Sequence, residues 1–233
     1  IGGCSMDTGI QGRRLSKTIR GVRDEGKVKA VVMRADSPGG DPLPSDLVSR
    51  ELKETMESKP VLISQGQVAA SGGYWISMHR HAIHASPFTL TGSIGVISGH
   101  FWDKELGEKI GMDYDQVKIG EHSDLNRGPV LPLIGAMIPH RPVTTEERAR
   151  AEATIRDLYR DFTEEVAEGR GMSVEDVDAV AQGRARSGPD GLEIGLIDEI
   201  GGPRGTLIAA KRAAGIPADR RVVLLEAPRP GPC

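Results

Sequence analysis

The sequence is poor in cysteine and in aromatic residues, and each scarcity excludes a class of protein. Its 233 residues contain two cysteines, Cys4 and Cys233, which lie near opposite ends of the chain without CxxC spacing. This arrangement indicates neither a disulfide framework nor a zinc site. Aromatic residues make up only 3% of the chain, so the core must be built mainly from Val, Ile, Leu, Ala and Met.

The sequence also lacks a strong net charge and a long apolar run. Lysine and arginine number 30 against 33 acidic residues, a formal charge of -3, so no global field attracts nucleic acid and no such partner is predicted. No signal-peptide core or apolar run of transmembrane length is present, which predicts a soluble chain. The length and the 38% hydrophobic content suit one well-filled domain.

Short β-type runs alternate with helical patterns in the first half. Residues 28–34 and 60–66 indicate buried strands, and the helix between them presents Leu47, Val48, Leu52 and Met56 on one face. We also expect strands in 82–86, 93–98 and 114–120, a helix that begins at Ser71, and another from about Trp102 to Ile110. The alternation predicts an α/β fold with a largely parallel sheet.

The second half is more helical. A capping box at Thr144 and Glu147 precedes an apolar stripe, which predicts a helix over 145–168, and Ser173 with Asp176 begins another. The four prolines in 127–143 predict an irregular loop with exposed apolar side chains.

We therefore expect a single domain over 1–233, with a β/α core in 1–130, a mainly helical extension in 140–212 and a tail in 213–233. Because the chain begins inside a glycine-rich loop, IGGCSMDTGI, we expect its first strand to lie upstream.

Ser71 lies between two alanines and two glycines in QVAASGGYWIS, directly before a helical run. Small neighbours leave its hydroxyl uncovered, and backbone N–H groups at a helix start can stabilise an anion, so this setting suits acyl transfer. A second glycine turn, RADSPGGD, follows the first predicted strand. Sites in parallel sheets form at the carboxyl ends of strands, where both turns are expected.

Four segments resemble, in order and spacing, the signal peptide peptidase A family, the S49 serine peptidases also called protease IV. They are VKAVVMRADSPGG, KPVLISQGQVAASGGYWIS, SPFTLTGSIGVI and GRARSGPDGLEIGLIDEIGG, between about Lys27 and Gly202. The resemblance implies a ClpP/crotonase-like superhelix of β-β-α units with a helical C-terminal extension. It also implies that Ser71 is the nucleophile and that the N–H groups of Gly40 and Gly72 form the oxyanion hole.

The family uses a lysine as base, and an amine can accept a proton near neutral pH only when its surroundings lower its pKa. One-domain members carry this lysine in the segment that corresponds to VKIGEHSDL, where this chain has Ser123. In two-domain members the N-terminal half supplies the lysine. The chain thus resembles the C-terminal half of a two-domain member whose upstream domain carries the base.

Three other residues are weighed as the base. Lys118 lies at an odd offset from Ser123, which on a strand turns it to the opposite face, so it is interpreted as a solvated lysine. His100 and His122 are candidates for a Ser-His arrangement, and His122 adjoins the vacated position. The remaining histidines, His79, His81, His84 and His140, follow no metal-ligand spacing. We therefore expect neither a metal nor a cofactor.

The resemblance further implies an apolar groove for signal peptides or similar extended segments, oligomers of ring or bowl shape, and association of the full-length bacterial protein with the cell membrane. Leu90 and Ile94 are candidates for substrate binding, with core packing as the alternative. Arg186 stands where relatives usually have an aromatic residue, from which we expect only a local surface change.

Two other function classes are weighed against the peptidase. A catalytically inactive ClpP-like scaffold or peptide-binding domain would keep the oxyanion hole without a base. A crotonase-type acyl-CoA enzyme has no need of a serine at the helix start, so Ser71 counts against it. AASGG also lacks the G-x-S-x-G pattern of an α/β-hydrolase elbow.

Overall fold

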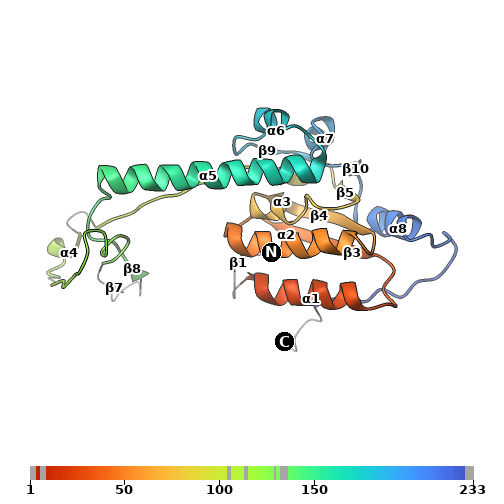
Figure 1. Cartoon of the computed structure of the whole chain (residues 1–233), viewed down its shortest axis with the longest axis horizontal. Helices are drawn as coiled ribbons and strands as arrows, with labels where there is room; N and C mark the ends of the chain where they lie inside the picture. Colours follow the sequence, from red (N-terminus) through yellow and green to blue (C-terminus); the bar gives the residue numbers. More distant parts are fainter. Residues whose placement is uncertain are drawn as a thin grey trace. The chain divides into compact units, whose positions relative to one another are not determined.

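The structure, a computed structural model, describes residues 4–5, 9–103, 106–112, 115–128, 130–131 and 136–228 (Figure 1). The strands are β1 Cys4–Ser5, β2 Ile10–Gln11, β3 Val31–Ser37, β4 Val61–Ala70, β5 Ala82–Ala85, β6 Leu90–Gly92, β7 Val130–Leu131, β8 Ala136–Met137, β9 Ala185–Arg186 and β10 Glu199–Ile200. The helices are α1 Gly12–Asp24, α2 Pro42–Met56, α3 Gly72–Trp75, α4 Leu106–Lys109, α5 Thr145–Arg170, α6 Val174–Val180, α7 Gly188–Glu193 and α8 Pro203–Ala213.

Strand β4 organises the main sheet. It pairs in parallel with β3 along one edge, and along the other edge with β5 at residues 62–64 and then with β6 at residues 68–70. Strand β10 extends the sheet beyond β5 in parallel, and β9 pairs antiparallel with β6. The predicted, largely parallel α/β sheet is thus confirmed, and its longest strand leads directly to Ser71.

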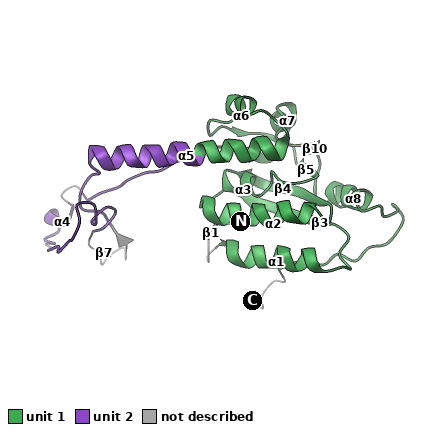
Figure 2. Cartoon of the chain, in the orientation of Figure 1, with its two compact units in different colours: residues 1–95, 159–233 green, residues 96–158 purple. Residues whose placement is uncertain are grey.

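The chain forms two compact units, one of Ile1–Gly95 with Tyr159–Cys233 and one of Val96–Leu158 (Figure 2). Helix α5 begins in the second unit and ends in the first. The single domain expected over 1–233, with its core, helical extension and tail, stays a prediction. Among the helices that the structure describes, none has the length and apolarity needed to cross a lipid bilayer.

The core of the first unit joins the chain around Ser71 to the end of α5. Trp75 stacks on Phe162, with ring centroids 4.4 Å apart. Tyr74 is fully buried and donates a hydrogen bond from its hydroxyl to the backbone oxygen of Leu196 at 2.8 Å. Burial of aromatic side chains contributes strongly to core stability. The residues that follow Ser71 are therefore anchored in the core of the first unit.

Several predicted elements are shorter than expected or absent. The helix after Ser71 is the four-residue α3, and the helix expected over 102–110 is reduced to α4, with residues 104–105 outside the described part. The described residues of 93–98 and 114–120 form no strand. Ile97, Val117 and Ile119 are almost fully exposed, and a strand needs a paired neighbour and a buried face that these residues lack.

The proline-rich segment also differs from expectation. Its described residues include β7 and β8, which pair antiparallel as Val130 with Met137 and Leu131 with Ala136. Of the apolar side chains expected to be exposed in 127–143, Ile138 and Val143 are half-buried, and the side chains of 129–137 lie outside the described part.

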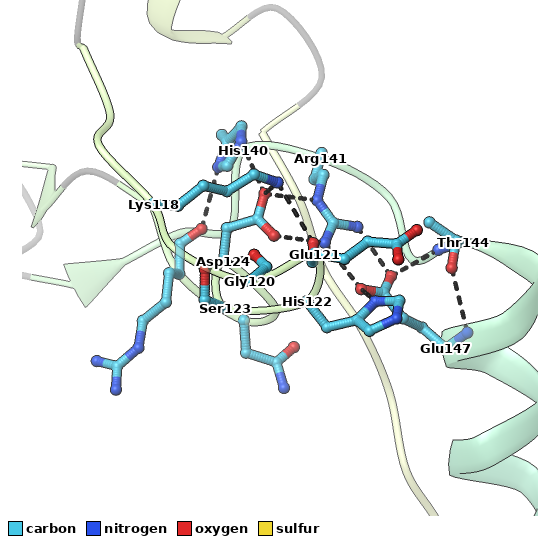
Figure 3. Close-up of polar contacts among 12 residues, drawn as sticks. Lys118, Gly120, Glu121, His122, Ser123, Asp124, His140, Arg141, Thr144 and Glu147 are labelled. Atoms are coloured by element: carbon cyan, nitrogen blue, oxygen red, sulfur yellow. Dashed lines mark hydrogen bonds and ion pairs between the residues drawn. The ribbon is translucent and has the colours of Figure 1, made fainter.

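A charged cluster holds the second unit together (Figure 3). Arg141 donates to both carboxylate oxygens of Asp124 at 2.7 and 2.8 Å and to both of Glu147 at 2.8 Å. Both carboxylates are 2% exposed. Glu147 also accepts from the N–H of Thr144, whose hydroxyl accepts from the N–H of Glu147, so the predicted capping box is confirmed. We call Asp124, Arg141 and Glu147 the Arg141 clamp.

The clamp has a marked electrostatic signature. Hydrogen bonds from Arg141 hold the pKa of Asp124 and the pKa of Glu147 well below their usual range. The same bonds raise the pKa of the Arg141 guanidinium. A carboxylate whose pKa is lower in the folded state stabilises that state above its unfolded pKa, about 4, and loses this contribution as the pH falls toward its folded pKa.

We therefore expect the second unit to open in acid before the first. Amide hydrogen exchange over residues 120–128 and 141–147, corrected for the intrinsic effect of pH, should lose protection as the pH falls from about 4 to about 2. Peptides from β4 serve as the internal reference. The same protection in 120–128 at pH 5 and at pH 2 would contradict the role assigned to the clamp.

Candidate active site

Ser71 occupies a backbone conformation that residues other than glycine rarely adopt. Its φ is 52° and its ψ is -122°, at the junction between β4 and α3. Its N–H donates to the backbone oxygen of Gly92 at 2.9 Å, and its own backbone oxygen accepts from Tyr74 and Trp75. Its side chain makes no capping bond to the helix that it precedes, and the residue is half-buried. Strained positions of this kind are frequent at functional sites.

The second glycine turn lies directly against Ser71. Gly39 has a φ of 110° and Gly40 a φ of 154°, both in the region that favours glycine. A β-carbon on Gly39 would lie 2.7 Å from the Ser71 β-carbon and 2.9 Å from the Gly72 nitrogen. Both distances are shorter than a van der Waals contact, so the two turns meet only because position 39 has no side chain.

Gly72 and Gly73 are constrained in the same way. A β-carbon on Gly72 would lie 3.2 Å from the Gly40 nitrogen and 2.6 Å from the Ser45 hydroxyl oxygen. One on Gly73 would lie 2.2 Å from the Ser37 backbone oxygen. The backbone of 72–73 is therefore packed against the backbone of 37–40.

This packing brings together the two amides that the sequence analysis named for the oxyanion hole. The Gly72 N–H is at the first position of a helix, where no intrahelical acceptor exists, and the Gly40 nitrogen lies beside it. Because α3 has only four residues, its dipole is small. Any stabilisation of an anion here would come from the direction of the two N–H groups rather than from the helix.

Two buried serines support the site and were not singled out from the sequence. The Ser37 hydroxyl accepts a hydrogen bond from the Gly39 N–H at 3.1 Å, which fixes the turn. The Ser45 hydroxyl donates to the Asp41 backbone oxygen at 2.9 Å. Both serines are fully buried. Ser37 lies within the SPGG turn itself, so its position was the available signal, whereas Ser45 looked like an ordinary helix residue.

The two candidates for substrate binding differ in exposure. Leu90 is 50% exposed on β6, whereas Ile94 is fully buried and belongs to the hydrophobic core. Burial of Ile94 favours the alternative of core packing for that residue. Arg186, on β9, pairs with Thr91 of β6 and donates to the Val180 backbone oxygen at 3.4 Å. It therefore takes part in the packing of the first unit.

Ser123 lies on the turn that the Arg141 clamp holds, in the second unit. It is exposed, and its hydroxyl donates to the Gly120 backbone oxygen at 2.9 Å (Figure 3). Neighbouring Lys118 places its ammonium 3.1 Å from an Asp124 carboxylate oxygen. The Lys118 ammonium is thus engaged by a carboxylate of the second unit.

Both histidine candidates are engaged within the second unit. The two ring nitrogens of His100 contact the Asn126 side-chain oxygen and the Arg141 backbone oxygen, each at 2.9 Å. His122 places its Nδ1 atom 2.9 Å from a Glu147 carboxylate oxygen. Both ring nitrogens of His100 are therefore engaged, whereas the contact of His122 with Glu147 uses only one of its two nitrogens.

One group among the described residues has the composition of a metal site. His79, Glu165 and Glu168 offer ligand atoms within 4.8 Å of one another. They lie in the first unit and come from the segment after α3 and from α5. No pattern of sequence spacing pointed to them.

Comparison with known proteins agrees with this geometry. The Peptidase family S49 matches residues 53–216. The chain is 41% identical over 221 residues to the chloroplastic serine protease SPPA of Arabidopsis thaliana, and this match covers 95% of the chain and 31% of that protein. It is 35% identical to the putative protease slr0021 of Synechocystis, with 89% and 71% covered. The chain thus spans about a third of the first relative and most of the second.

Solved structures share the fold at low sequence identity. A mutant of the 1510-N membrane-bound stomatin-specific protease aligns over 95% of the chain and 87% of its own, with a TM-score of 0.57 and 16% identity. A mutant of ClpP1 from Listeria monocytogenes aligns over 88% and 91%, with a TM-score of 0.55 and 14% identity. The predicted ClpP/crotonase-like fold is therefore confirmed. Together with the family match over residues 53–216, it establishes that the chain belongs to peptidase family S49.

Proposed function

We propose that the chain is the nucleophile-bearing part of a serine endopeptidase, with Ser71 as the nucleophile and a lysine base supplied by another domain or subunit. The observation that carries the proposal is the positive φ of Ser71 beside the Gly39–Gly40 turn. This conformation directs a half-buried serine away from capping its own helix. The family supports the reaction class, and the geometry supports the assignment of the residue.

In this mechanism the Ser71 hydroxyl attacks the carbonyl carbon of a peptide bond while the base removes its proton. Negative charge then develops on the carbonyl oxygen, where the N–H groups of Gly40 and Gly72 donate to it. Collapse of the tetrahedral intermediate expels the amine, which takes the proton from the base. Water then attacks the resulting ester of Ser71 while the base takes a proton from it. Collapse of this second intermediate releases the acid product, and the Ser71 oxygen takes the proton back.

The proposal that the lysine comes from another domain or subunit rests on the serine at position 123. A serine there cannot act as an amine base, and the Lys118 ammonium is paired with Asp124. In a half-unit of a two-domain protein, the partner half provides the missing group. The coverage of 31% of the Arabidopsis relative is consistent with a longer full-length protein.

We further propose that the substrates are signal peptides or other apolar peptides, bound in extended form with contact to the exposed Leu90. A related S49-like structure was solved "in complex with a substrate peptide". The exposed apolar side chains of the second unit, among them Ile97, Phe101 and Ile119, suit contacts between subunits of a homo-oligomer. We propose association with the bacterial cell membrane for the full-length protein.

The decisive experiment is active-site labelling of the full-length protein with a fluorophosphonate probe. Wild type should be labelled and should cleave an apolar peptide, and Ser71→Ala should lose both activities, by about 10⁴-fold or more in turnover. Ser58→Ala is the control, because Ser58 is an exposed serine just after the C-terminal end of α2, whereas the N-terminal part of that helix packs against Gly72. Unchanged labelling in a folded Ser71→Ala protein would show that the nucleophile is another residue.

The origin of the base is tested by building it into this chain. The chain alone should show little or no reaction, whereas Ser123→Lys should give weak labelling that disappears in the Ser123→Lys, Ser71→Ala double variant. A lysine at 123 becomes a base only where its surroundings lower its pKa. Ser123→Met controls for side-chain length.

Absence of labelling in a folded Ser123→Lys protein across pH 7 to 10, the range over which a lysine amine with a lowered pKa loses its proton, would contradict the position assigned to the base. Strong Ser71-dependent labelling of the unmodified chain would show that it needs no external lysine. His122→Ala in that chain would then test whether the histidine beside Glu147 is the base.

A further inference from the structure

A mixed histidine and glutamate cluster lies in the first unit and takes no part in the proposed reaction. One ligand atom each from His79, Glu165 and Glu168 lies within 4.8 Å of the other two. The imidazole is only 5% exposed. Glu165 and Glu168 are three residues apart on α5, so the helix presents both carboxylates on the same side. The cluster thus combines a buried imidazole with two carboxylates from a second, rigid element.

Negative charge exceeds fixed positive charge around this cluster. His79 places its Nε2 atom 2.9 Å from Glu165, and the Lys53 ammonium lies 2.5 Å from Glu168. A third carboxyl, Asp46 of α2, is close enough that burial and the charge of Glu165 raise its pKa, against smaller opposite effects of Arg50 and His79. The Arg50 Nε atom lies 3.6 Å from a carboxylate oxygen of Glu54, so part of its positive charge is already paired.

We propose that His79, Glu165 and Glu168 form a binding site for one divalent cation of the zinc class. Neutral imidazole and carboxylate are ligands that zinc and cobalt accept, at about 2.0–2.2 Å from the metal. Glu168 can adjust its position to reach the metal, because its side chain is 56% exposed. Lys53 must release Glu168, and water or Asp46 completes the coordination.

The site would act by fixing structure. Its ligands tie α5 to the segment that follows α3, and α3 begins next to Ser71. A bound cation would stabilise the folded first unit by its binding free energy. This inference does not rest on the proposed peptidase activity, since the ligands are separate from the Ser71 site.

The test uses the chain after treatment with a chelator. Titration with Co²⁺ should produce visible d–d absorption typical of four or five nitrogen and oxygen ligands, and Zn²⁺ should displace Co²⁺ and raise the Tm. Glu168→Gln should weaken Zn²⁺ binding by at least about tenfold, as loss of a metal-site residue commonly does. Lys53→Met should bind Zn²⁺ more tightly than wild type, because it removes the competitor for Glu168.

Glu164→Gln is the matched control. Glu164 is an equally exposed carboxylate on α5, and it lies near Arg160 rather than in the cluster. Its loss should leave Zn²⁺ affinity unchanged. His79→Gln should abolish the Co²⁺ spectrum, and if that variant does not fold, Glu168→Gln and Lys53→Met still decide the question. Absence of a Co²⁺ spectrum, or equal effects of the Glu164 and Glu168 substitutions, would overturn the proposal and leave an ordinary ion pair between His79 and Glu165.

Discussion

The contact between two glycine turns, at residues 39–40 and 72–73, determines the candidate active site. Gly39 touches Ser71 and Gly72, and Gly73 touches the backbone of Ser37, at distances that exclude any β-carbon. This packing leaves the Ser71 backbone at positive φ, a conformation that costs on the order of 1–3 kcal/mol and persists only when its surroundings enforce it. The stacked pair of Trp75, the last residue of α3, and Phe162 of α5 provides such surroundings.

Strand β4 positions the two glycine turns relative to each other. It pairs with β3, which leads into the glycine turn, and its own last residues lead into Ser71. Because both strands are parallel, their carboxyl ends lie at the same edge of the sheet, and the two turns meet there. Ser71 and the glycine turn at 39–40, which come from separate segments, are thus brought together by strand pairing, without a long loop.

The second unit is held by a different kind of interaction. Arg141 joins two buried carboxylates by four hydrogen bonds, which offset the free-energy cost of burying both charges. Ser123 lies on the turn that this clamp orders. Because Arg141 lowers the pKa of both carboxyls, the second unit is expected to lose this stabilisation as the pH falls below about 4.

The sequence alone determined the parallel α/β fold, the family, and the identity of the two glycine turns, because small residues at strand ends leave a strong local pattern. Helix α5 was also predictable, since its capping box and apolar stripe are local. The prediction of strands at 93–98 and 114–120 was wrong, because β-type residues form a strand only where a neighbouring strand pairs with them. Only the tertiary structure could place Ile94 in the core, Arg141 between its carboxylates, and His79 beside Glu165 and Glu168. Those contacts join residues far apart in sequence, and the packing of whole elements decides them.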